Sequence, residues 1–168
     1  ADTLGHGRDD RTLIALVLEL YAKVQSHAYP ERWLADNRVS WEQFSGEGSF
    51  DETPYAAVLL QSIRRKADYW QTLLRRACGQ MTGCEALEKA YLDRFAAVAE
   101  AFGALSAACT GWDAAQKALG GIAFPRLGAV RASAGCGALK EQMKKLWDGC
   151  KEEYKDLSSL LAVSGEEY

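Results

Sequence analysis

Three long stretches of this chain repeat apolar residues at every third or fourth position, which is the spacing of one buried face of an α-helix. The clearest is 84–108, which the repeat predicts to be a helix with one continuous core stripe. The stretches 53–77 and 137–161 each add another apolar face. The stripe in the first of these consists of Leu87, Tyr91, Phe95, Val98, Phe102 and Leu105. Because such faces must pack against one another, the chain is predicted to be all-α, an irregular bundle of three long and several short helices.

A further amphipathic helix is expected near the N-terminus. Asp9 or Asp10 suits its N-cap, and the pattern runs to about His27. Its apolar face is predicted to consist of Leu13, Leu16, Val17, Leu20 and Val24.

Shorter helices are expected after this one. Pro30 suits the first turn of a helix over 30–37, and 41–44 predicts another short helical piece. Trp33 and Leu34 are expected to pack back against the first helix.

Glycine, proline and threonine mark the remaining boundaries. Thr53 is expected to cap the long helix 53–77, with Pro54 in its first turn. A short helix over 112–119 is expected to stop at the Gly120–Gly121 pair. Loops are predicted at 45–49, 78–83 and 121–136.

The totals favour one helical domain over residues 1–168 and exclude a uniformly basic nucleic-acid binder. The net charge is −3. Residues 1–60 contain 5 Lys/Arg and 10 Asp/Glu, whereas residues 61–168 contain 15 and 13, so local basic faces remain open. No apolar run is long enough for a membrane span, so no membrane partner is expected.

Cysteine usage argues against a disulfide framework or a zinc site. There are five cysteines, an odd number, with no CxxC pair. We therefore expect small free thiols in a cytoplasmic protein. The five are Cys78, Cys84, Cys109, Cys136 and Cys150.

No motif in the chain predicts catalysis, a cofactor or a metal. Nucleotide binding through a phosphate loop needs GxxxxGK[ST], which is absent. His6 and His27 are expected at the surface. Adjacent helical acids, as at 152–153, point about 100° apart and do not form a carboxylate pair. A cysteine–histidine pair stays open from sequence alone, but nothing local activates a thiol.

Basic residues are the remaining candidates for function, because Lys and Arg can hold nucleic-acid phosphates. The alternative is an ordinary solvated helix face, with acids such as Asp68 and Asp148 interleaved. Phe124 and Pro125 are expected to anchor the loop that carries two of the arginines. The candidates are Arg64, Arg65, Arg75 and Arg76 on the first long helix, Arg126 and Arg131 in the loop, and Lys140, Lys144, Lys151 and Lys155 in a row on the last helix.

The tryptophans have two possible roles, core packing and stacking on bases. Trp70 and Trp147 lie on apolar faces and are expected in the core. Trp33, Trp41 and Trp112 leave both roles open.

Two stretches resemble the larger, AddA-type chain of ATP-dependent helicase–nucleases. Residues 8–34, RDDRTLIALVLELYAKVQSHAYPERWL, resemble one stretch of that chain. Residues 120–155 resemble a later one, with a short Trp-led helix, FPRL..VR, and LKE..K.L.D..K. Between them, 69–108 matches mainly in helical character. The resemblance covers nearly the whole chain in order and spacing.

The resemblance implies a parent that is similar to UvrD-like superfamily 1 motors joined to a RecB-type nuclease. Such a parent is a 3′–5′ DNA helicase and exonuclease that uses ATP and Mg²⁺, works with a B subunit, and processes double-strand ends for recombinational repair. The segment resembled is a helical accessory insert of the first motor domain, without ATPase or nuclease motifs.

From this resemblance we expect a non-catalytic fragment that contacts the DNA backbone near the fork. The alternative is a packing module between motor domains, or with the B subunit, without DNA contact.

Overall fold

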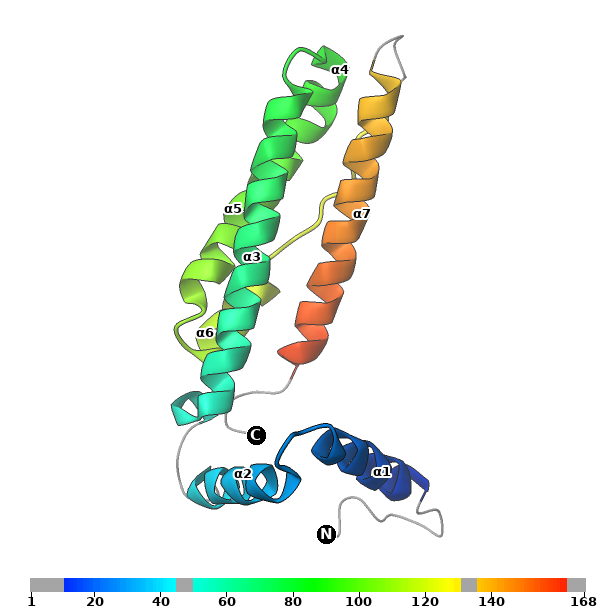
Figure 1. Cartoon of the computed structure of the whole chain (residues 1–168). Helices are drawn as coiled ribbons and strands as arrows, with labels where there is room; N and C mark the ends of the chain where they lie inside the picture. Colours follow the sequence, from blue (N-terminus) through cyan, green and yellow to red (C-terminus); the bar gives the residue numbers. More distant parts are fainter. Residues whose placement is uncertain (1–10, 45–49, 131–135, 163–168) are drawn as a thin grey trace. The chain divides into compact units, whose positions relative to one another are not determined.

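The computed structural model describes residues 11–44, 50–130 and 136–162, and all the regular structure in them is helical (Figure 1). The predicted all-α class is therefore confirmed. The expected cap at Asp9 or Asp10 and the expected loop 45–49 lie outside the described residues. Among the described helices, none is long and apolar enough to cross a membrane.

The chain divides into two compact units, Ala1–Gly48 and Ser49–Tyr168. The expectation of one domain over 1–168 stays a prediction. All ten basic candidates belong to the second unit.

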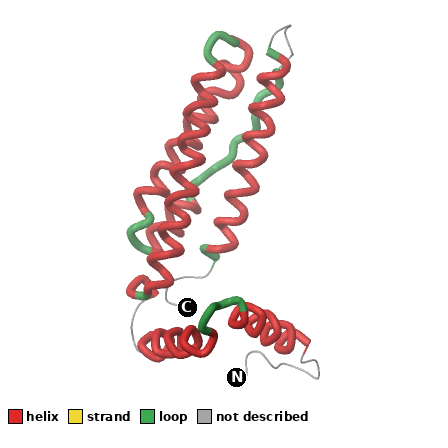
Figure 2. Tube along the Cα trace, in the orientation of Figure 1, coloured by secondary structure: helices red, strands yellow, loops and turns green. Residues whose placement is uncertain are grey.

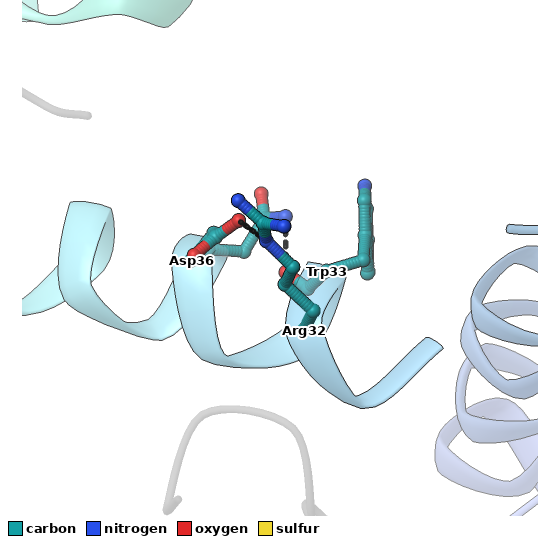
Figure 3. Close-up of polar contacts among 4 residues, drawn as sticks. Arg32, Trp33 and Asp36 are labelled. Carbon is teal, nitrogen blue, oxygen red and sulfur yellow. Dashed lines mark hydrogen bonds and ion pairs between the residues drawn. The ribbon is translucent and has the colours of Figure 1, made fainter. Parts of the chain in front are cut away.

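The first unit pairs α1 (Arg11–Gln25) with α2 (Pro30–Phe44). The expectation of two separate helical pieces after Pro30 was wrong, because α2 is one uninterrupted helix. Nothing between the two pieces is a glycine or proline, so no residue there stops the helix. In its middle, Arg32 Nε lies 3.8 Å from Asp36 Oδ2, and Asn37 Nδ2 donates to Trp33 O at 2.8 Å (Figure 3).

The predicted apolar face of α1 is mostly exposed. Only Val24 is buried, at 5%, whereas the other four members are between 40% and 53% exposed. His27 is not the surface residue expected, because its ring stacks on Trp33 at 4.6 Å and its Nε2 is buried. Trp33 therefore packs back as expected, whereas Leu34 remains 46% exposed.

The second unit begins with a 3₁₀ turn, η1 (Phe50–Glu52), which leads into α3 (Pro54–Met81). Thr53 caps α3 as expected: its Oγ1 accepts a hydrogen bond from Ala56 N at 3.1 Å, and Pro54 follows at the first helical position.

The end of α3 was placed one turn too early. The helix continues through Gly79 to Met81, because Ala77 and Met81 are both buried in the core. That burial outweighs the roughly 1 kcal/mol by which glycine disfavours a helix interior. The turn comes at Gly83, whose φ of 94° lies in the left-handed region that favours glycine.

The stretch predicted as one helix over 84–108 is a continuous helical run with a π-helical segment inside it. It comprises α4 (Glu85–Leu87), the π-segment η2 (Glu88–Leu92) and α5 (Asp93–Ala108). All six residues of the predicted core stripe are buried. Within η2, the carbonyl of Ala90 accepts a hydrogen bond from the Arg94 guanidinium.

Two further elements complete this unit, α6 (Trp112–Gly120) and α7 (Gly137–Leu160). The stop at Gly120 is confirmed. Residues 122–130 form an extended segment between these helices, which we call the strap (Figure 2). Helix α3 packs most extensively on α5 and also contacts α6 and α7.

Aromatic rings join α5, the strap and α7. Trp147, which is 1% exposed, stacks on Phe95 with ring centroids 4.8 Å apart. Phe124 meets Trp147 and Tyr154 edge-on, at 5.5 and 5.3 Å. Phe124 is thus a loop anchor, as expected, and Trp147 is a core residue.

The other tryptophans of this unit also pack against protein. Trp112 is fully buried and meets Phe50 edge-on at 4.8 Å, which assigns it to the core. Trp70 is half-buried beside Gly149, where a Cβ would lie 3.3 Å from Trp70 Cη2. This close approach brings α3 against α7.

The cysteine expectation was wrong for two of the five residues, because Cys84 and Cys136 form a disulfide. The two residues lie 52 positions apart, one at the start of α4 and one just before α7. The sequence hid this pair because no short spacing marks it. Cys78, Cys109 and Cys150 are free thiols.

We expect Trp147→Ala to lower the free energy of unfolding by about 3–5 kcal/mol, because it removes a fully buried ring that contacts both α5 and the strap. Urea denaturation followed by circular dichroism measures this change. Val58→Ala, at a side chain that is 65% exposed, is the matched control and should shift stability by less than about 0.5 kcal/mol. Equal losses in the two variants would contradict the assigned core.

The disulfide should stabilise the fold by about 2–4 kcal/mol, because it restricts the unfolded chain over a long loop. The double variant Cys84→Ser plus Cys136→Ser should therefore unfold at lower urea than the oxidised parent. A dithiol reductant should destabilise the parent to the same extent and leave the double variant unchanged. A parent whose midpoint ignores the reductant would contradict the bond's contribution.

Candidate nucleic-acid interface

The described basic candidates occupy three elements of the second unit: α3, the strap and α7. Arg131 lies outside the described residues. Figure 1 shows α3 between α5 and α7, and α3 contacts both helices. The candidates therefore do not converge on one pocket but belong to separate helix faces.

On α3 the four arginines form two aligned pairs, because eleven residues make about three helical turns. All four are exposed. Arg75 Nη2 lies 2.9 Å from Glu100 Oε1 on α5, so this arginine is already paired. Within the described residues, Arg65 and Arg76 form no ion pair.

On α7 most of the lysine row is engaged within the protein. Lys144 Nζ lies 3.6 Å from Glu141 Oε1, and Lys155 Nζ lies 2.8 Å from Glu152 Oε1. Exposed pairs of this kind contribute less than about 1 kcal/mol, but they lower the net field that an anion meets.

Lys140 has a structural contact instead of an acidic partner. Its Nζ donates to Val130 O at 2.9 Å, which fastens the end of the strap to α7. Lys151, half-buried, is the member of the row for which no ion pair is found in the described part of the chain.

The strap presents Arg126 between two anchors. Before it, Phe124 packs on the α7 aromatics. After it, Gly128 passes so close to η2 that a Cβ there would lie 3.3 Å from Ala90 Cβ. The exposed Arg126 side chain is thereby carried on a segment that is fixed on both sides.

The balance of charge separates the two long helices. Helix α3 contains five Lys/Arg (64, 65, 66, 75 and 76) and one acid, Asp68, a net of +4. Helix α7 contains five lysines and five acids, a net of zero. A lysine row considered without its neighbouring acids hid this difference. Helix α3 is therefore the stronger candidate for an anionic partner.

Tyr69 is an exposed aromatic residue on α3 that the sequence reasoning did not include. Its side chain is 58% exposed and meets Trp70 edge-on at 5.6 Å. The signal available in the sequence is its position, one helical turn after Arg65.

The three free thiols are not activated nucleophiles. Burial raises the pKa of Cys150 to about 12, with Glu153 adding to the effect. Burial likewise raises the pKa of Cys109 to about 11, although Arg64 opposes it. Cys78 has its pKa raised by burial as well. Within the described residues, no group of three or more His, Cys, Asp or Glu side chains is placed to hold a metal ion.

Comparison with curated proteins finds relatives along nearly the whole chain, all of them the larger, AddA-type chain of an ATP-dependent helicase/nuclease. The chain is 29% identical over 168 residues to the one from Syntrophomonas wolfei, covering 99% of this chain and 13% of that protein. It is 30% identical over 171 residues to the protein of the same name from Alkaliphilus metalliredigens, covering 99% and 14%. A match at 29% to that of Ruminiclostridium cellulolyticum spans 56% of this chain.

These relatives are far longer than this chain, which spans about an eighth of their length. No family model matches the chain, and no solved structure matches it significantly. The expected resemblance to AddA-type helicase–nucleases is confirmed for one region of those proteins.

Thiol alkylation should be slow at Cys150 and roughly tenfold faster at Cys109, because at pH 8 the thiolate fractions are about one in ten thousand and about one in a thousand. Iodoacetamide labelling followed by peptide mass spectrometry measures both rates. A cysteine in a short unstructured peptide is the reference and should react much faster than either. A Cys150 that reacts as fast as the peptide would contradict the buried, unactivated thiol.

Proposed function

We propose, from its homology to one region of the AddA-type helicase/nuclease proteins, that this chain is a non-catalytic helical accessory region of such a protein and contacts the DNA backbone near the fork. The alignment over 99% of the chain carries the first part of this proposal. The net positive charge of α3 and the exposed Arg126 support the second.

The wider context belongs to the same proposal. The parent would be a 3′–5′ DNA helicase and exonuclease in the cytoplasm that uses ATP and Mg²⁺ and works with a B subunit. This chain would be the accessory insert of the first motor domain. The chain contains no GxxxxGK[ST] motif, which supports assigning nucleotide binding to other parts of the parent.

The contact would be electrostatic and independent of base sequence. Guanidinium and ammonium groups bind phosphate oxygens, which position a protein on DNA without reading bases. Arg126 suits this role because its strap is anchored on both sides, so little order is lost on binding. The arginines of α3 add charge on a rigid helix.

A packing module without DNA contact is the second candidate, and one observation favours it. Helix α1 exposes six apolar side chains by 50–62% each: Ile14, Leu16, Val17, Leu18, Leu20 and Tyr21. Exposed apolar surface of this kind marks protein contacts. Other domains of the parent, or the B subunit, would cover it.

We expect the chain to bind forked duplex DNA weakly at low salt and to lose that binding steeply as salt rises, because each phosphate contact releases counterions. Fluorescence anisotropy with a labelled fork measures the affinity. Arg126→Ala plus Arg131→Ala should reduce affinity and lower the slope of log affinity against log salt by about two.

The control removes two positive charges outside the candidate set, with Arg32→Ala plus Lys117→Ala. This variant should bind like the parent. An absence of binding at low ionic strength would contradict DNA contact and favour the packing module.

A further inference from the structure

Helix α3 carries a face that nothing in the described protein covers. At about 100° per residue, six exposed residues fall within a sector of about 80° on the side opposite the buried residues. We call them the outer stripe. Its members are Val58, Ser62, Arg65, Tyr69, Thr72 and Arg76.

The outer stripe contains no acid. The one acid of α3, Asp68, lies toward α5, where its Oδ1 accepts a hydrogen bond from Ser106 Oγ at 2.6 Å. Arg65 and Arg76 form no ion pair within the described part of the chain, in contrast to Arg75 on the flank. The stripe therefore presents two unneutralised guanidinium groups about 16 Å apart along the helix axis.

An aromatic ring stands between the two charges. Tyr69 lies one turn beyond Arg65 and about two turns before Arg76. Its ring is 58% exposed, and the edge-on contact with Trp70 restrains its orientation. An exposed ring that is already restrained stacks on a partner with little further loss of entropy.

From this arrangement we propose that the outer stripe of α3 binds single-stranded DNA, with Arg65 and Arg76 on phosphates and Tyr69 stacked on an unpaired base. This inference rests on the proposed DNA contact and specifies its location and the form of the DNA. Alternating cationic and aromatic groups is the composition that binds single strands without sequence preference. In a duplex the base faces are already stacked, so Tyr69 would have no partner there.

The α7 lysine row is the competing location within the same unit. Its helix is neutral overall, and two of its lysines are paired with neighbouring acids. The row also lacks an exposed ring comparable to Tyr69. The inference therefore separates two surfaces that carry the same number of positive residues.

The test uses the 168-residue chain and two fluorescent probes, an oligothymidine of about 20 nucleotides and a duplex of about 20 base pairs, at roughly 50 mM salt. Arg65→Ala plus Arg76→Ala should weaken single-strand binding at least about tenfold. It should also lower the salt slope by about 1.4, since each single-strand phosphate contact contributes about 0.7.

The ring is tested separately from the charge. Tyr69→Ala should weaken single-strand binding at least about fivefold while leaving the salt slope unchanged, whereas Tyr69→Phe should bind like the parent. All these side chains are exposed, so the variants should retain the melting temperature and helical circular dichroism of the parent.

The matched control is Lys144→Ala plus Lys155→Ala, which removes the same charge from α7 and should leave single-strand affinity unchanged. An α7 variant that loses as much affinity as the α3 variant would overturn the inference. So would a Tyr69→Ala variant with parental affinity, or a chain that binds only the duplex. In those cases the proposed DNA contact stands, whereas failure to bind either probe would overturn both.

Discussion

The second unit depends on the stacking of Trp147 against Phe95. This one contact joins α7 to α5 in the core, and the strap is added to it through Phe124. Stacked and edge-on aromatic pairs contribute beyond the apolar area that they bury. The basic residues of the strap and of α7 take their positions from this cluster, because each lies on an element that the cluster holds. The surface chemistry thus follows from the packing of three rings.

Much of this fold was predictable from spacing alone. The core stripe from Leu87 to Leu105 is buried as the repeat predicts, and the Thr53 cap forms as expected. The π-segment was not predicted, although the stripe contains a trace of it. Two successive steps of four residues, from Leu87 to Tyr91 to Phe95, drift on an ideal α-helix, and the wider π-turn keeps these residues on one face.

Features that depend on distant partners were beyond the sequence reasoning. The continuation of α3 past Gly79 follows from the burial of Met81, which no local signal shows. The pairing of Cys84 with Cys136 and the neutralisation of the α7 lysines have the same origin. The basic candidates were correctly found as residue types, but their ranking required the acids beside them. For α1 the periodicity identified an apolar face, but the structure leaves most of it exposed.

The bond between Cys84 and Cys136 closes 52 positions of the chain into a covalent ring that contains α4, η2, α5, α6 and the strap. Mechanical tension transmitted along the polypeptide therefore passes from the end of α3 to the start of α7 through two sulfur atoms. The segments inside the ring carry none of that load and cannot be drawn out lengthwise while the bond is intact. In a larger assembly that moves along a polymer, such a ring would act as a short inextensible link between two long levers.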